Sequence, residues 1–223
     1  MSRADEIREN LAAVEARIAA ACARARRNRD EVLLVAVTKV FPATDVAHVI
    51  AAGATNVGEN KVQEARDKQP LVGASARWHL IGHLQSNKAK DAVKLFDVVQ
   101  TVDSIALAEK LARAAASAGK RQEVLLQVNV GREEQKSGAA PDDVMLLARA
   151  AMALPELHVS GLMTIPPAGE PDAMRPYFRE LRAMRDDLGL RELSMGMTDD
   201  FDVAIEEGAT IVRVGRAIFG ARG

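Results

Sequence analysis

The stretch "EVLLVAVTKVFP" (residues 31–42) is an apolar run that ends on a lysine. Five consecutive apolar residues, 33–37, are typical of a strand that is buried on both faces, as in a parallel sheet. Lys39 follows the strand directly, and Pro42 ends the element. A lysine in this position is either a side chain that reaches solvent or a reactive amine.

Seven further β-rich runs follow, separated by helical segments. The predicted strands are 32–38, 55–59, 76–82, 96–102, 123–130, 158–165, 191–195 and 210–215. Predicted helices between them include 44–53, 104–119, 141–154 and 172–189. Many of these helices end on glycine, at Gly53, Gly119, Gly189 and Gly208. Strands that alternate with helices indicate right-handed βαβ units and a parallel sheet.

Eight such units predict a single α/β domain, a closed (β/α)8 barrel of the TIM type. A doubly wound open sheet is the competing architecture, but it more often has about five to seven strands. The 223 residues are fewer than the roughly 250 of a typical barrel and suit a small one. We expect one domain over 1–223, with the eight units in 31–223 and no room for a second domain.

Residues 1–30 predict an extra N-terminal helix packed on the barrel. Its apolar residues recur at spacings of four and three, and Ser2 is a suitable N-cap. Four arginines near its end, Arg24, Arg26, Arg27 and Arg29, resemble a nucleic-acid patch. Their simpler interpretation is positive charge that complements the C-terminal end of the helix dipole.

The composition gives no sign of a nucleic-acid or membrane partner. Lys and Arg number 30 against 31 Asp and Glu, a net charge of −1. The one cysteine, Cys22, cannot form an internal disulfide, which suits a reducing compartment. There is no apolar signal segment, and no apolar run approaches the roughly 18 residues of a membrane span. We therefore expect a cytoplasmic protein.

Polar side chains gather at the predicted strand exits, where barrel enzymes place their active sites. Lys39 and Asn60 follow the first two strands, His79 lies on the third, and Lys136 follows the fifth. His79 suits either a hydrogen-bonded core position or a pocket wall. The sequence has no HExxH, Cys/His cluster, GxSxG, GxGxxG or GxxxxGK[ST]. A metal site, a serine-hydrolase triad and the usual nucleotide loops are therefore unsupported.

The last unit, "TIVRVGRAIFG" (210–220), predicts a phosphate pocket. Ile211 and Arg213 share one strand face, so an inward Arg213 is a buried cation that needs a partner. Gly215 lets the backbone approach closely before a short helix. Barrels bind phosphate after strands seven and eight at such a helix N-terminus.

The exit of the seventh strand adds a second half to this pocket. Ser194 offers a hydroxyl and Gly196 a permissive backbone. Asp199 and Asp200 would repel a phosphate, and we expect them in the first turn of a helix capped by Thr198.

A lysine and a phosphate pocket at one barrel end suit a phosphorylated aldehyde held as a Schiff base. Apolar surroundings or a cation such as Arg213 lower the pKa of a lysine and make its amine nucleophilic. Pyridoxal 5'-phosphate fits, with its aldehyde at Lys39 and its phosphate at the last two turns. Arg213 near the pyridine nitrogen would disfavour its protonation and weaken the ring as an electron sink. Such an arrangement is unfavourable for most pyridoxal-dependent reactions, though not for all.

At these motifs the chain resembles the pyridoxal phosphate homeostasis protein family. The resemblance runs through "VAVTK" (35–39), "VGEN" (57–60), "WHLIGHLQSNK" (78–88), "GLMTI" (161–165), "LSMGMTDDFDVAI" (193–205) and "GATIVRVGRAIFG" (208–220). It implies a single barrel similar to the N-terminal domain of bacterial alanine racemase. It also implies a protein that binds pyridoxal phosphate without established catalysis and acts in vitamin B6 and amino-acid homeostasis.

The same resemblance implies roles for individual residues. Lys39 corresponds to the Schiff-base lysine, Arg213 to the residue that faces the pyridine nitrogen, and Lys136 to a second lysine in cofactor handling. Pocket-lining positions match Asn60 and His79, and phosphate contacts match Ser194, Met195, Gly196, Gly215 and Arg216. Where the family often has tyrosine, this chain has Lys61. An aromatic contact is then missing, or a third lysine can meet the aldehyde.

Three functions compete at this point. The first, which we expect, is a non-catalytic carrier or regulator, monomeric, with apo pyridoxal-dependent enzymes as candidate recipients. The second is a pyridoxal-dependent enzyme such as an amino-acid racemase. Alanine racemase completes its site with a tyrosine from a second domain, whereas Tyr177, the one tyrosine here, lies in a helix away from the strand exits. The third is an aldolase that uses Lys39 on a sugar phosphate.

Overall fold

The computed structural model describes residues 1–72 and 76–221 and contains a closed barrel of eight parallel strands. β1 pairs with β2 on one side and with β8 on the other, which closes the sheet. The predicted (β/α)8 barrel is confirmed, and the open sheet is wrong. The strands are β1 (Leu33–Val37), β2 (Asn56–Glu59), β3 (Arg77–Leu80), β4 (Val98–Val102), β5 (Gln122–Gln127), β6 (Leu157–Met163), β7 (Glu192–Ser194) and β8 (Ile211–Val214).

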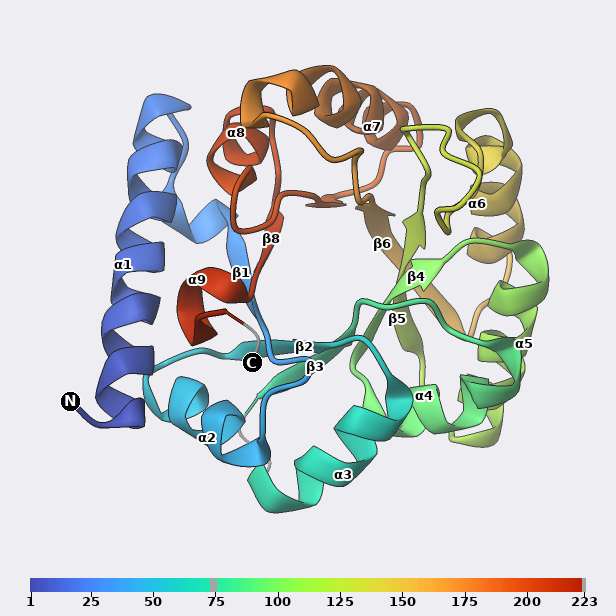
Figure 1. The fold of residues 1–223 in the computed structure, drawn as a ribbon. Coiled ribbons are helices and arrows are strands. Elements are labelled where there is room, and N and C mark those ends of the chain that lie inside the picture. Colours follow the sequence, from blue (N-terminus) through green and yellow to red (C-terminus); the bar gives the residue numbers. More distant parts are fainter. Residues whose placement is uncertain (73–75, 222–223) are drawn as a thin grey trace.

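Helices form a ring around the strands (Figure 1). They are α1 (Arg3–Arg24), α2 (Ala43–Ala51), α3 (Val62–Val72), α4 (Ala89–Leu95), α5 (Ile105–Ser117), α6 (Val144–Met152), α7 (Arg175–Asp187), α8 (Phe201–Glu206) and α9 (Arg216–Phe219). The described residues also form short 3-10 turns, which are η1 (Arg29–Glu31), η2 (Ser86–Lys88), η3 (Pro141–Asp143) and η4 (Pro171–Met174). The four predicted helix-ending glycines all have positive φ, as a left-handed helix end requires. Within the described ranges, no helix combines the length and apolar character that a membrane crossing needs.

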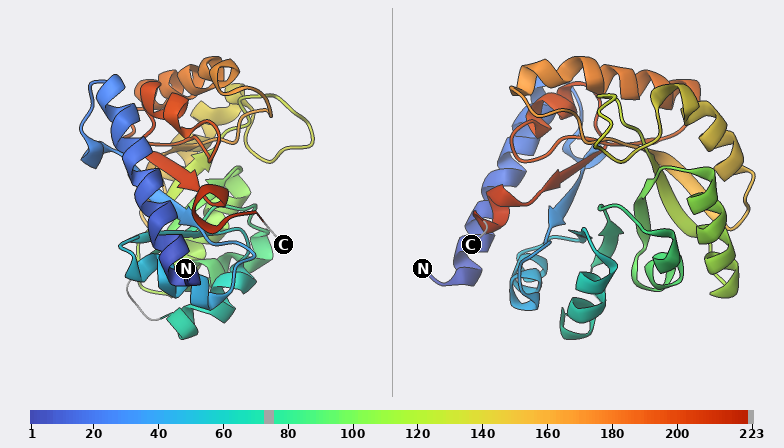
Figure 2. Two further views of the ribbon diagram at one scale, coloured as in Figure 1. Left: turned by 60° about the vertical axis from the view of Figure 1, so that its left-hand side comes forward. Right: turned by 45° about the vertical axis from the view of Figure 1, so that its right-hand side comes forward.

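The predicted extra helix is α1, which runs along the outside of the barrel and packs against α2, α8 and α9 (Figures 1 and 2). Ser2 is its N-cap and forms a capping box with Asp5. Its apolar stripe and Cys22 are buried. At its C-terminal end, Arg24 pairs with Glu206 at 2.8 Å. Just beyond that end, Arg27 donates to the carbonyl oxygens of Ile205 in α8 and of Ala209. Two of the four arginines therefore hold α1 to the barrel.

The strands separate an outer apolar core from a small inner one. The inner cluster consists of Val35, Val98, Leu125, Met163 and Ile211. Alternate residues of β8 point outward, and Val212 and Val214 pack against the helices. Arg213 therefore shares the inner face of β8 with Ile211, as predicted from the strand period.

Candidate functional site

A cavity of about 420 Å³ opens at the carboxyl ends of the strands, a size typical of small-molecule sites. Residues at or after the ends of seven strands line it: Val37, Lys39, Asn60, Ile81, Gly82, His83, Gln127, Lys136, Ser137, Ile165, Met197, Thr198, Asp199, Arg213, Gly215 and Arg216. Six of the ten predicted site residues lie on this wall. A second hollow of about 280 Å³ shares Lys39, Gly215 and Arg216 with it.

Lys39 lies two residues beyond β1, half-buried, where both hollows meet. It shares the larger cavity with Arg213, which is only 3% exposed. The guanidinium of Arg213 donates from Nη1 to Ser194 Oγ at 2.6 Å and from Nη2 to the Thr164 carbonyl oxygen at 2.8 Å. Burial lowers the pKa of Arg213 to about 10, with Asp200 favouring the charged form. Arg213 is therefore a buried cation with the partners that it needs.

A chain of hydrogen bonds continues from Arg213 through the barrel interior. Ser194 Oγ donates to Gln100 Oε1 at 2.6 Å, and Gln100 Nε2 lies 2.9 Å from His79 Nδ1. Because the Gln100 amide donates there, His79 carries its proton on Nε2, which lies 3.0 Å from Asn56 Oδ1. Burial lowers the pKa of His79 to about 3, so the imidazole is neutral. His79 does not line the cavity. Of the two positions that the sequence allowed, it occupies the hydrogen-bonded core position and not the pocket wall.

The end of β7 lies deeper than the sequence suggested. Ser194 and Met195 are fully buried. The Met195 amide donates to the Ile211 carbonyl oxygen, and the Gly196 carbonyl oxygen accepts from the Arg213 amide. These bonds extend the β7–β8 ladder beyond the strand, and Gly196, with φ of +90°, then turns the chain. The following residues 197–199, rather than 194–196, reach the cavity. A direct phosphate contact from Ser194, Met195 or Gly196 therefore has no support in the cavity wall.

The expected helix start at Thr198 is wrong. α8 begins at Phe201 and its N-cap is Asp200, whose Oδ1 accepts from the Met197 amide at 2.6 Å. Burial raises the pKa of Asp200. Asp199 stays exposed and pairs with Arg216 at the rim of the cavity. The two aspartates thus shape the 197–200 turn instead of the first turn of a helix.

The start of α9 packs directly on β1. A Cβ at Gly215 would lie 3.2 Å from the Val37 carbonyl oxygen and 3.3 Å from the Val37 Cβ. A larger residue would have to displace the strand that leads to Lys39. Glycine at this position therefore brings the turn after β8 close to the lysine.

The loop after β5 brings a second lysine to the cavity. Lys136 Nζ donates to the Pro166 carbonyl oxygen at 2.9 Å and pairs with Glu133 at 2.5 Å. Asn129 organises this loop by donating to the Glu133 carbonyl oxygen at 2.8 Å. Lys61, in contrast, is exposed and does not line the cavity, so a third lysine at the aldehyde has no structural support.

Ten wall residues were not predicted as site residues: Val37, Ile81, Gly82, His83, Gln127, Ser137, Ile165, Met197, Thr198 and Asp199, the last two having been expected at the start of a helix. The one signal that the sequence offered for them was position, since most of them lie near the end of a predicted strand, just beyond it, or next to a predicted site residue. Their chemistry is mixed. Ile81, Ile165 and Met197 offer apolar surface for a flat ring. Among residues 1–72 and 76–221, no cluster of His, Cys, Asp and Glu suits a metal ion.

The donor set fits a phosphorylated aldehyde. Two lysine amines and two guanidinium groups share one cavity with apolar side chains, and Gly215 at the start of α9 lines the same cavity. An aldehyde suits a lysine, and a phosphate suits the arginines and the turns of Thr198 and Gly215. This set of groups meets the requirements of pyridoxal phosphate.

Comparisons with known proteins agree with this geometry. Residues 9–223 match the family described as alanine racemase, N-terminal domain. The pyridoxal phosphate homeostasis protein of Pseudomonas aeruginosa is 46% identical over 220 residues, which are 97% of this chain and 96% of that protein. A solved structure from Bifidobacterium adolescentis, described as an unknown protein, is 39% identical, with a TM-score of 0.91 over 97% of this chain and 96% of that one.

PipY of Synechococcus elongatus, solved with PLP bound, is 37% identical, with a TM-score of 0.83 over 96% of this chain and all of that chain. Identity at this level over nearly the full length of both chains shows common membership and a common fold. The chain therefore belongs to the pyridoxal phosphate homeostasis protein family, whose barrel is that of the alanine racemase N-terminal domain.

Proposed function

We propose that this protein binds pyridoxal 5'-phosphate in the barrel cavity, holds it on Lys39, and acts in vitamin B6 and amino-acid homeostasis without catalysing turnover. The observation that carries the proposal is the placement of Lys39 and the buried Arg213 on one cavity of suitable size. The bound cofactor in PipY and the names of the curated relatives support it.

Each wall residue then has a distinct task. The Lys39 amine condenses with the aldehyde, with loss of one water, to form a Schiff base. Arg216 and the turns of Thr198 and Gly215 hold the phosphate. Asn60, in the loop after β2, and Lys136, in the loop after β5, form other parts of the pocket wall. Ser194, Met195 and Gly196 act indirectly, because their bonds to Arg213 and Ile211 fix the turn that carries Thr198.

The same geometry favours a carrier over a racemase. His79 is buried and neutral and does not face the cavity. Within the described part of the chain, the cavity wall carries no tyrosine, and Tyr177 lies on α7. Apo pyridoxal-dependent enzymes are the proposed recipients of the cofactor.

Titration with pyridoxal phosphate, followed by visible absorption, tests the role of Lys39. Lys39→Ala should remove the band of the lysine-bound cofactor and weaken binding about 100-fold, because the covalent bond is lost. Lys61→Ala is the matched control, since Lys61 is exposed and away from the cavity, and it should bind like the wild type. A wild-type spectrum from Lys39→Ala, or its loss in Lys61→Ala, would contradict the proposed site.

A further inference from the structure

The backbone on both sides of Lys39 is held by side chains from β2 and α3. The Thr38 carbonyl oxygen accepts from Lys68 Nζ at 2.9 Å, and the Thr38 hydroxyl donates to Glu59 Oε1 at 2.7 Å. On the other side, the Val40 amide donates to Glu64 Oε2 at 2.9 Å. The proposed cofactor lysine is therefore flanked by two anchored residues.

Lys68 joins these anchors into one network. Its ammonium group lies 2.8 Å from Glu59 Oε1 and 3.4 Å from Glu64 Oε2, in addition to the Thr38 carbonyl oxygen. Three acceptors match the three N–H groups of a lysine. Glu59 is fully buried and Lys68 is 8% exposed, so few other partners can replace these bonds. Burial opposes ionisation of Glu64, but the Val40 amide and Lys68 contribute to a lowered pKa, which keeps Glu64 a charged acceptor.

Val40 shows what this network holds in place. Its φ is +65°, a left-handed conformation that β-branched residues rarely adopt. Such a conformation persists only where the surroundings fix it. Val40 is 64% exposed, so apolar packing does little to restrain it. The Phe41 amide donates to the Thr38 carbonyl oxygen at 3.1 Å and closes the turn over Lys39 and Val40, and the Glu64 hydrogen bond restrains the Val40 amide within it. A chain that relaxed at Val40 would turn the adjacent Lys39 to a different direction.

We propose that Glu64 and Lys68 of α3, together with Glu59 of β2, are positioning residues that fix Lys39 toward the cavity. The inference rests on the proposed function, in which Lys39 holds the cofactor. None of the three lines the cavity, so they act through the backbone of Thr38 and Val40 and not by contact with the ligand. α3 thus serves as the support of the reactive lysine.

Glu64→Ala tests the proposal directly, with affinity for pyridoxal phosphate and thermal unfolding of the cofactor-free protein as the two measurements. Loss of the charged hydrogen bond to Val40 should weaken affinity about tenfold. Glu64→Gln keeps an acceptor oxygen and should recover most of that loss. Arg66→Ala is the control, because Arg66 lies on the same helix but is not part of the network around Lys39. Its guanidinium group pairs with Asp91 at 2.6 Å. This variant should bind like the wild type and unfold at a temperature close to that of Glu64→Ala.

A second substitution separates positioning from general damage. Glycine adopts positive φ without strain, so Val40→Gly should reduce the dependence of Lys39 on Glu64. In that background, Glu64→Ala should weaken affinity by only about twofold, and a double-mutant cycle measures the difference. An equal loss in both backgrounds, or an equal loss in Arg66→Ala, would overturn the positioning role.

The wild type distinguishes this inference from the function on which it rests. A wild type that takes up no pyridoxal phosphate would overturn the proposed function and this role together. A wild type that binds, with a folded Glu64→Ala that binds equally well, would overturn the positioning role alone.

Discussion

Arg213 and Lys39 were visible in the sequence because each stands at a defined point of a strand. The period of two along β8 places Arg213 on the same face as Ile211, inside the barrel. Lys39 follows a strand whose apolar residues are buried. Residues 197–199, and not 194–196, line the cavity, because backbone bonds extend the β7–β8 ladder past the strand end. The phosphate contacts of residues 194–196 stay a prediction. Nothing in the local sequence reports such an extension.

His79 illustrates the limit of residue-level prediction, since its partners come from two other strands. The sequence allowed a core position or a pocket wall, and the bonds to Asn56 and Gln100 select the core. Those partners are 23 and 21 residues away. Only the closed sheet brings them together.

The buried neutral state of His79 predicts how stability depends on pH. Its folded pKa is about 3, below the ordinary value of 6.5. The unfolded chain binds a proton below pH 6.5 while the folded chain does not, so the contribution of His79 is complete above 6.5. It then falls by about 1.4 kcal/mol per pH unit toward pH 3. His79→Gln should remove this slope, as measured by urea unfolding at pH 7.5 and 5.5.

His158→Gln is the matched control, because His158 on β6 is exposed. It should leave the difference between the two pH values unchanged. If His79→Gln and the wild type lost the same stability on acidification, His79 would not be held neutral in the folded protein.

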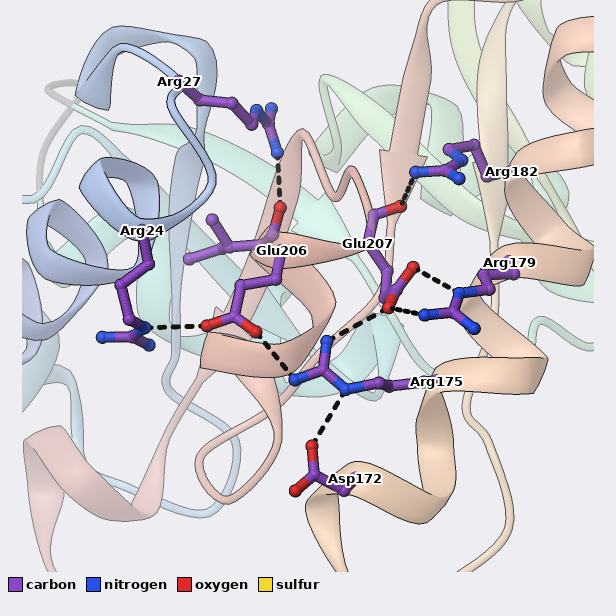
Figure 3. Close-up of polar contacts among 9 residues, drawn as sticks. Arg24, Arg27, Asp172, Arg175, Arg179, Arg182, Glu206 and Glu207 are labelled. Atoms are coloured by element: carbon purple, nitrogen blue, oxygen red, sulfur yellow. Dashed lines mark hydrogen bonds and ion pairs between the residues drawn. The ribbon is translucent and has the colours of Figure 1, made fainter.

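At the scale of elements, α8 is joined to α1 and α7 by charged side chains (Figure 3). Arg179 donates two hydrogen bonds of 2.8 Å to the Glu207 carboxylate, and Arg175 donates one of 3.1 Å. Arg175 also donates to Glu206, which pairs with Arg24 of α1. Glu207 is only 5% exposed, so it cannot exchange these partners freely for water.

Glu207→Ala should therefore reduce the free energy of unfolding by about 1–3 kcal/mol, because three charge-assisted bonds are lost and Arg179 loses both of its bonds to this carboxylate. Chemical denaturation measures this change. Glu180→Ala on α7 is the control, since its pair with Arg132 at 2.7 Å is more exposed and should contribute less than about 1 kcal/mol. Equal losses in the two variants would show that the buried position of Glu207 has no special weight.

The arginines of α7 and the network of α3 were outside the reach of sequence reasoning. Helical periodicity predicted that α7 exists, but it did not predict the partners of its arginines. Glu59 and Lys68 are nine residues apart on a strand and a helix, and their contact depends on how α3 packs against β2. Pairings of this kind follow from tertiary packing and not from spacing along the chain.

At the scale of the whole molecule, most of the fold was predictable. Apolar runs alternate with amphipathic segments eight times, and glycines mark helix ends at the right points. Closure follows from the pairing of β1 with β8, which then brings Lys39, Lys136 and Arg213 to one cavity although they lie far apart in the chain. The sequence indicated at which strand ends the reactive and polar side chains lie. Which of these side chains reach the cavity depends on the register of the sheet, which the sequence alone does not give.

The most direct test of the central claim is borohydride reduction of the protein with pyridoxal phosphate, followed by peptide mass mapping. The account predicts one pyridoxyl adduct, on the peptide that contains Lys39. A colourless protein without an adduct would contradict pyridoxal phosphate binding and leave the aldolase alternative next. An adduct on Lys136 or Lys61, with Lys39 unmodified, would keep the cofactor and contradict the assigned lysine.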